Sequence, residues 1–121
     1  MDVTQQIVID ESHAAHLSRS GIRSGQLLGQ MIQFPLESGT QQTPGTFKIH
    51  DAPAVGVLLW PEMFMRAKMA LEITVDGEQA GRCKPLVTKD KTRQLAVVIS
   101  VNVVDFLENM FEQLCNEKFV V

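Results

Sequence analysis

Residues 63–75 read MFMRAKMALEITV, and the order of their apolar side chains distinguishes a strand from a helix. Most of these residue types favour helices when each is considered singly. Every odd position from Met63 to Val75 is nevertheless apolar, whereas most even positions are polar, including Arg66 and Glu72. Because successive side chains of a strand point to opposite faces, this alternation is typical of a β-strand. We therefore predict that 63–75 is mainly strand.

Turn and strand signals on both sides extend this strand into an antiparallel sheet. The residues DGE at 76–78 predict a hairpin turn, which is followed by a return strand and, after the turn TKDKT, by another strand. Upstream, short apolar runs bounded by Gly, Pro or polar residues predict further strands, about six in all. With 63–75 itself, strands are expected at 26–37, 46–50, 57–60, 79–87 and 93–100, with a loop at 38–45. The short apolar run at 5–10 is a further candidate strand.

The end of the chain has the spacing of an amphipathic helix. Residues 103–115 read VVDFLENMFEQLC, preceded by Asn102 as a suitable N-cap and with Asp105 in the first turn. Their apolar stripe consists of Val103, Leu107, Met110, Phe111 and Leu114. A sheet of this size must close or be covered to protect its edges. We therefore predict a mainly β fold, a six-stranded antiparallel β-barrel with a C-terminal α-helix.

The start of the chain differs in composition from the rest. Residues 11–25 are polar and rich in Gly and Ser, which predicts a flexible or partly helical arm. We expect an N-terminal arm at 1–25 and the barrel with its helix at 26–121, together forming a single domain. A length of 121 residues fits one domain of ordinary size.

Composition narrows the class of protein. With 45% hydrophobic residues, 21% charged residues and a net charge of −3, the chain is expected to be a globular domain without a broad nucleic-acid-binding face. No apolar run approaches the ~18 residues of a membrane span. The first ten residues have neither the basic flank nor the cleavage site of a signal peptide. Together with only two cysteines, this predicts a cytoplasmic protein.

Two short motifs suggest a ligand site. Arg19 and Arg23 are four residues apart in RSGIR, and a guanidinium group can both grip a phosphate and stack on a base. The second motif is DAPAVG at 51–56, in which a carboxylate could accept hydrogen bonds from a guanine edge. On composition alone, the first is an ordinary solvated face and the second an ordinary turn.

The two motifs in this order, followed by strands and a closing helix, resemble PilZ domains. That family has an R-x-x-x-R pair, then D-x-S-x-x-G at the start of a later strand. The segment VIDESHAAHLSR, at 8–19, is also similar to the PilZ subunit of alginate polymerases. The resemblance implies a barrel that binds cyclic di-GMP and regulates exopolysaccharide synthesis or motility. The ligand-binding residues implied by position are Arg19, Arg23, Asp51, Pro53 and Gly56.

One alternative keeps the fold but not the ligand. Pro53 stands where the family has Ser, so two possible hydrogen bonds to a nucleotide are lost. Val55 stands where a second Gly is common, and a β-branched residue there resists positive φ. The alternative is therefore a degenerate PilZ-like domain that serves as a protein-interaction adaptor.

Other classes have less support in the sequence. A barrel that binds single-stranded nucleic acid would need a basic groove and stacking aromatics, which this chain lacks. We expect no enzyme activity, no cofactor and no metal site. The expected partners are cyclic di-GMP, an unidentified protein effector, a second copy in a homodimer and a membrane-bound complex, but not nucleic acid.

Overall fold

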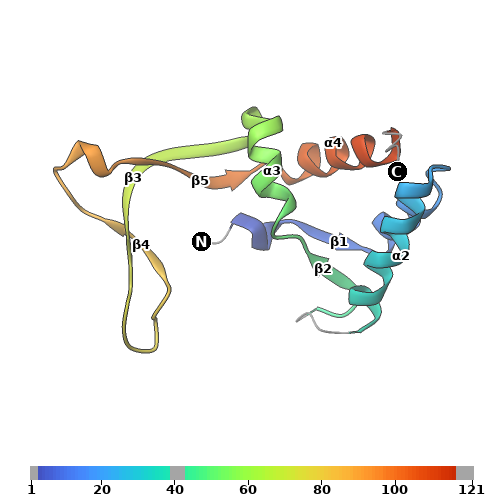
Figure 1. Ribbon diagram of the computed structural model, residues 1–121, viewed down its shortest axis with the longest axis horizontal. Helices are drawn as coiled ribbons and strands as arrows, with labels where there is room; N and C mark the ends of the chain where they lie inside the picture. Colours follow the sequence, from blue (N-terminus) through green and yellow to red (C-terminus); the bar gives the residue numbers. More distant parts are fainter. Residues whose placement is uncertain (1–2, 39–42, 117–121) are drawn as a thin grey trace.

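The computed structural model describes residues 3–38 and 43–116, and it shows a mixed α/β fold with two small sheets (Figure 1). Part of the loop expected at 38–45 lies outside these residues. The α-helices are α1 (Glu11–Ser18), α2 (Arg23–Glu37), α3 (Ala52–Leu59) and α4 (Val103–Asn116). The strands are β1 (Val8–Asp10), β2 (Thr46–Lys48), β3 (Phe64–Ile73), β4 (Cys83–Leu86) and β5 (Leu95–Val101). Short 3-10 helices are η1 (Val3–Gln6), η2 (Pro61–Met63) and η3 (Lys91–Arg93).

The prediction of a six-stranded barrel is wrong. Strands β1 and β2 form one antiparallel sheet, with Ile9 opposite Phe47, and the second sheet has the order β4-β3-β5. In the described part of the chain neither sheet closes on itself. The PilZ-type barrel is therefore replaced by an arrangement in which helices supply much of the core.

Two segments expected to be strands are helical. Residues 26–37 lie within α2, where Leu28, Ile32 and Leu36 recur every fourth residue and so share one helix face. Pro35 lies in the last turn of this helix, so it does not mark the end of a strand. Most of 57–60 belongs to α3, because a short apolar run can be either a strand or a buried helix.

The strand at 63–75 and the C-terminal helix are confirmed. Strand β3 pairs with β5 along its first part and with β4 along its second, with a bulge between Met65 and Arg66. Its buried residues are Phe64 and Ala70. The odd-numbered Ala67, Met69 and Leu71 are half-buried, whereas the even-numbered polar residues Arg66, Lys68 and Glu72 are exposed. Helix α4 begins after Asn102, whose side chain exchanges hydrogen bonds with Asp105.

The polar stretch at 11–25, expected to be a flexible or partly helical arm, contains helix α1, which packs against α2. Helices α1 and α2 are joined by a short turn in which Gly21 has a φ of 76°. A Cβ atom at Gly29 would lie 2.9 Å from the Ala14 carbonyl oxygen, so α1 and α2 cross closely at this glycine. Within 1–25, the range expected to form the arm, β1 pairs with β2 from the range expected to form the barrel. The lack of a side chain at Gly29 of α2 therefore allows close contact with Ala14 and Ser18 of α1.

The core consists of two adjoining apolar clusters. One contains Ile7, Phe64, Val101 and Phe106, with the Phe106 ring edge-on to Phe64 at 5.7 Å between centroids. The other contains Ile9, Leu17 and Phe111. Helix α4 supplies Phe106 to the first cluster and Phe111 to the second, so it joins the two halves of the core.

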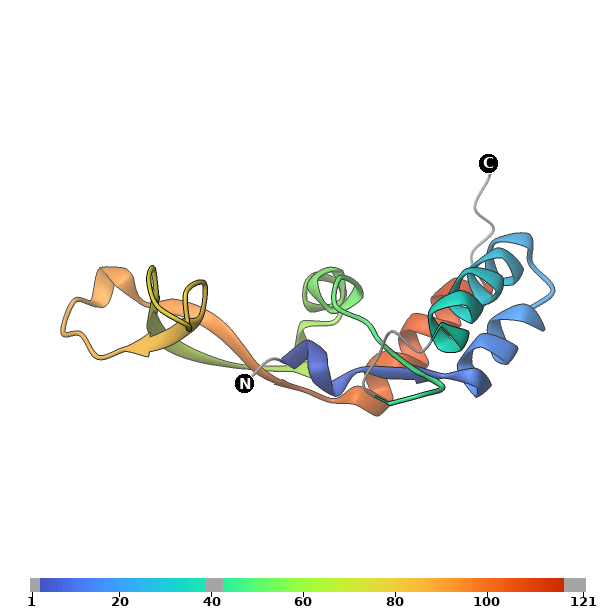
Figure 2. The ribbon, with the colours of Figure 1, turned by 90° about the horizontal axis from the view of Figure 1, so that it is seen from below.

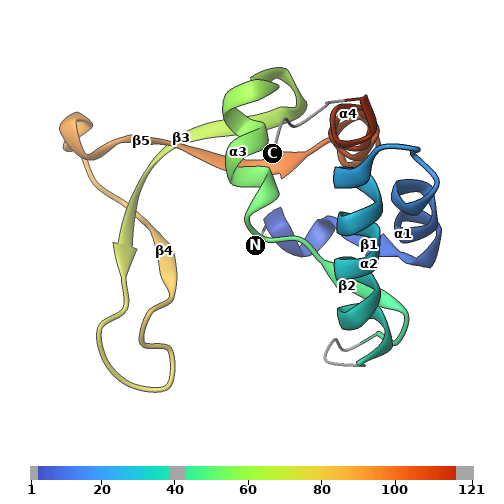
Figure 3. The ribbon, with the colours of Figure 1, turned by 45° about the vertical axis from the view of Figure 1, so that its right-hand side comes forward.

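The second sheet extends away from this core. Figures 1 and 3 show the β3–β4 hairpin at the opposite end of the molecule from α1 and α2. Beyond the strands the hairpin is closed by bonds between Thr74 and both Gly81 and Arg82, and Gly77 and Gly81 have positive φ. Within 3–38 and 43–116, no helix combines the length and apolarity that a membrane span requires.

Candidate functional site

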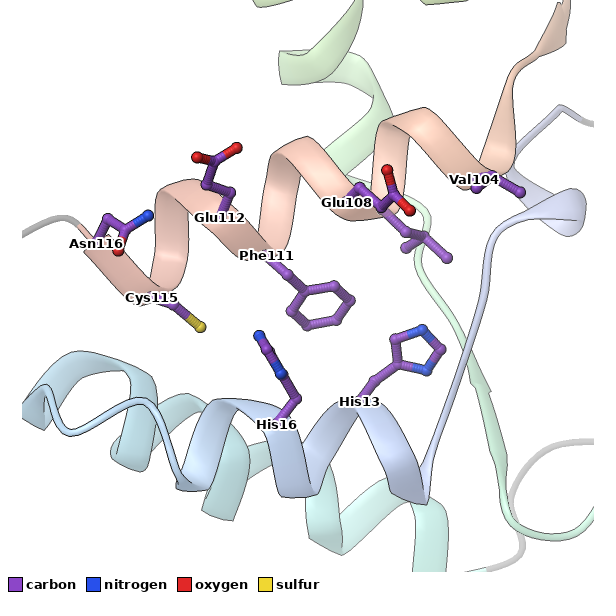
Figure 4. Close-up of a pocket in the computed structure, with 9 residues that line it drawn as sticks. His13, His16, Val104, Glu108, Phe111, Glu112, Cys115 and Asn116 are labelled. Carbon is purple, nitrogen blue, oxygen red and sulfur yellow. The ribbon is translucent and has the colours of Figure 1, made fainter.

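A hollow of about 660 Å³ lies between α1 and α4 (Figure 4). Figure 4 shows the rings of His13 and His16 directed from α1 toward Phe111 on α4, with the Cys115 sulfur beside them. The carboxylate of Glu112 points away from both histidines. The hollow is lined by His13, His16, Val104, Leu107, Glu108, Phe111, Glu112, Cys115 and Asn116.

The two histidines of this hollow have structural roles. The His13 ring stacks on Phe111 with 5.1 Å between centroids, and the His16 ring meets Phe111 edge-on at 6.1 Å. His13 also completes the N-terminal cap of α1, because its Nδ1 accepts from the Asp10 amide and lies 2.7 Å from Asp10 Oδ1. Burial raises the pKa of Cys115, which disfavours its thiolate. The two histidine rings that line the hollow therefore pack α1 against Phe111 of α4.

The cap itself makes a prediction about pH. The Ser12 hydroxyl, together with His13, lowers the pKa of Asp10 from 3.8 to about 2. Since the folded pKa is depressed, the carboxylate stabilises the fold fully above pH 3.8, and this stabilisation is lost as pH falls through about 2. We expect Asp10→Ala to lower the free energy of unfolding at pH 7 by about 1 kcal/mol.

Urea denaturation of the wild type, Asp10→Ala and Asp10→Asn at pH 7 and at low pH measures both effects. Asn keeps a capping oxygen, so we expect Asp10→Asn to lose less stability than Asp10→Ala. The difference in free energy of unfolding between the wild type and Asp10→Asn should become smaller as pH falls from 3.8 toward 2. A difference that does not change with pH would contradict a depressed pKa at Asp10.

A second, smaller site lies where α3 begins. A hydrogen bond of 2.6 Å joins His50 Nδ1 to Thr4 Oγ1, which is 46 residues away in sequence. The next residue, Asp51, is the N-cap of α3, but its carboxylate does not cap the helix. Both side chains are exposed, and His50 borders a pocket of about 160 Å³. The pocket is lined by Val3, Thr4, His50, Pro53, Ala54, Val57, Phe64 and Val98.

This corner, defined as Thr4, His50 and Asp51, combines three hydrogen-bonding side chains with an apolar wall. The imidazole is held through Nδ1, and its Nε2 makes no hydrogen bond within the described residues. The Asp51 carboxylate likewise has no hydrogen-bonded or ionic partner there. Asp51 follows His50 in sequence but does not line the pocket. An unpaired carboxylate can accept hydrogen bonds from hydroxyl groups, and a positioned imidazole can exchange a proton with a ligand.

The five residues predicted to bind cyclic di-GMP fall on different elements. Arg19 is the C-cap of α1 and Arg23 is the first residue of α2, and both are exposed. Pro53 and Gly56 are buried in α3, where Gly56 packs against the Phe106 ring. No hydrogen bond or ion pair of the described chain joins the arginines to the Asp51 motif, and their role in binding stays a prediction.

Sequence reasoning missed Thr4 and His50 as site residues. The dipeptide His50–Asp51 was visible as two adjacent polar groups before an apolar run. Its pairing with Thr4 depends on the β1–β2 sheet, which brings residues near 4 and near 50 together. Among the described residues, no three His, Cys, Asp or Glu side chains gather closely enough to hold a metal ion.

Comparisons with known proteins give a likeness in structure alone. No protein-family model matches the chain, and no curated protein matches it. Among solved structures, the chain is similar to a purine-preferring ribonucleoside hydrolase from Gardnerella vaginalis, with a TM-score of 0.79 and 25% identity. That likeness covers 94% of this chain and 37% of the hydrolase.

A plant nucleoside hydrolase, PpNRh1, is similar with the same TM-score of 0.79 and 19% identity, over 97% of this chain and 40% of that one. The chain therefore spans about two fifths of the length of either solved protein. What these likenesses show is that nearly all of the chain shares its fold with part of a nucleoside hydrolase.

Proposed function

We propose that this chain forms part of a nucleoside hydrolase-type fold and that the corner of Thr4, His50 and Asp51 contacts a ribonucleoside. The single observation that carries the proposal is the His50–Asp51 pair, in which the imidazole is positioned by Thr4 and the carboxylate is left unpaired. The fold likeness to two nucleoside hydrolases over at least 94% of the chain supports it. Fold alone does not imply function, so the proposal depends mainly on the side chains of Thr4, His50 and Asp51.

The chemistry of the reaction fits these two groups. Hydrolysis of a ribonucleoside adds water across the bond between the ribose and the base, and the departing base gains a proton. A carboxylate such as Asp51 can accept charge-assisted hydrogen bonds from ribose hydroxyls. An imidazole such as His50 can donate a proton to a leaving group. The apolar wall beside His50, which includes Val57 and Phe64, suits the face of a base.

The chain alone supplies only part of such a site. Because it spans about two fifths of each solved hydrolase, we place the complete catalytic unit in an assembly with further polypeptide. The expectation from the sequence that this protein is not an enzyme stays a prediction. On this proposal, the chain alone binds a nucleoside weakly and hydrolyses none at a measurable rate.

Nuclear magnetic resonance of the ¹⁵N-labelled chain, titrated with inosine, tests the proposal. We expect the amide signals of Thr4, His50 and Asp51 to shift. Because a hydrogen bond to a charged group contributes about 1.5–3 kcal/mol, Asp51→Asn should weaken binding by about 10- to 100-fold. The matched control Asp76→Asn, at an exposed turn position, should not change binding.

Two outcomes would contradict the proposal. One is the absence of shifts at the corner when inosine is near its solubility limit. The other is equal weakening by Asp51→Asn and Asp76→Asn. A parallel titration with cyclic di-GMP examines the earlier prediction, which would show as shifts at Arg19 and Arg23.

A further inference from the structure

We infer that the outer surface of α3, together with the groove between α3 and α4, binds polypeptide that completes the nucleoside hydrolase fold. This inference rests on the fold likeness that also supports the proposed function, and it does not require nucleoside binding. The surface is defined here as the docking face, and it consists of Val55, Leu58 and Leu59 on α3 with the groove that they border.

The composition of α3 is the first reason. Its eight residues read APAVGVLL and include no polar side chain. A helix that is apolar on all sides is normally enclosed within a larger protein. Here the inner side is covered, because Pro53 and Gly56 are buried and Gly56 lies against Phe106. The outer side is open, with Leu58 80% exposed and Val55 and Leu59 more than half exposed.

The groove beside α3 is the second reason. It has a volume of about 400 Å³, and Phe106 and Met110 of α4 form part of its lining. Gln113 is the polar side chain among the lining residues, which are Ala52, Val55, Gly56, Leu59, Trp60, Phe106, Met110, Gln113 and Leu114. Single exposed apolar residues are common on proteins, but an apolar helix beside an apolar groove marks a place for a partner.

A second apolar face lies on α2. Leu27, Met31 and Phe34 are spaced four and three residues apart, so they share one side of the helix, and all three are more than half exposed. Figure 2 shows α2 and α3 on the same side of the strands. The open apolar surface therefore spans more than one element of the fold.

The extent of this surface favours the rest of the fold over a second copy. At least 94% of the chain aligns with each solved hydrolase, yet about three fifths of each hydrolase has no counterpart in the chain. A two-fold dimer would require one self-complementary patch. Two separate apolar faces, on α2 and on α3, are instead expected if further parts of a larger fold cover both helices. The expected occupant is the remaining three fifths of such a fold, presenting apolar helix or strand faces.

Co-expression of this chain with the non-aligned three fifths of the Gardnerella vaginalis hydrolase tests the inference. We expect a one-to-one complex, identified by its mass in size-exclusion chromatography with light scattering. Leu58→Asp would place a charge in a dry contact and should weaken the complex about tenfold or more. Val87→Asp is the matched control, because Val87 is 100% exposed and follows strand β4, whereas the docking face is on α3.

Each other outcome would overturn the inference. If the chain elutes as a homodimer that Leu58→Asp disrupts, the docking face binds a second copy instead. If no complex forms, or if Leu58→Asp and Val87→Asp weaken it equally, α3 is not the contact. The mass measurement does not depend on nucleoside binding. A complex can therefore form even if His50 and Asp51 bind no nucleoside, and nucleoside binding can be observed even if no complex forms.

Discussion

Replacing Phe106 by alanine is expected to lower the free energy of unfolding by about 3–5 kcal/mol, the range found for buried aromatic residues. Phe106 is 0% exposed and lies at the centre of the cluster with Ile7, Phe64 and Val101. Its ring also meets Trp60 edge-on at 6.1 Å and fills the space left by Gly56. The alanine variant would lose these contacts and leave a cavity between α3 and α4.

Urea denaturation followed by circular dichroism measures this loss. Phe34→Ala is the matched control, because Phe34 is 75% exposed on α2 and its removal should change stability by no more than about 0.5 kcal/mol. Similar losses in the two variants would contradict the packing of α4 described above.

The second large effect is expected at Leu17. This residue is 0% exposed on α1, where it packs with Ile9 and Phe111. We expect Leu17→Ala to lower the free energy of unfolding by about 2–5 kcal/mol. A loss of this size would show that α1 is an integral part of the core, as the pairing of β1 with β2 also implies.

The control is the same substitution at a surface position of the next helix. Leu27 is 56% exposed on α2, so Leu27→Ala should have a small effect on the isolated chain. If Leu17→Ala lowered the free energy of unfolding as little as Leu27→Ala, α1 would behave as a loosely attached arm, and the packing of Leu17 would not stabilise the fold.

The elements predictable from sequence were those with one clear period. The apolar residues at 63–75 alternate with a period of two, which does not fit a helix, so strand β3 was predictable. The spacing of Leu107, Phe111 and Leu114 is helical and predicted α4. The segment at 26–37 carries its apolar residues every fourth position, but Pro35 suggested the end of a strand. The run at 57–60 is uniformly apolar and has no period at all.

The closed barrel failed for a different physical reason. It followed from the rule that sheet edges must be protected, but closure into a barrel is only one way to protect them. Here helices α1, α2 and α4 provide the core near β1 and β2, and the larger sheet keeps open edges in the described chain. Nothing in the local spacing distinguishes a strand that closes a barrel from one that ends in a small sheet.

Only part of the candidate site could be predicted from the sequence, because the rest of it depends on tertiary contacts. Asp51 was singled out from its motif, and His50 is its neighbour. Thr4, which positions the imidazole, is 46 residues away and comes close to it only through tertiary folding. Arg19 and Arg23 were grouped with Asp51 by motif order, whereas the structure assigns them to the α1–α2 turn.

The shared pairing of β3 has a consequence for how the chain opens. Phe64–Met69 pair with β5 and Ala70–Ile73 pair with β4, so each of these residues is held by one ladder. Near Phe64 that ladder is anchored in the core, whereas toward Ile73 it leads into an exposed hairpin. Amide protons at the far end can therefore exchange with solvent through small local openings, while those beside Phe64 need the core to unfold. The boundary between slow and fast exchange falls inside a single strand.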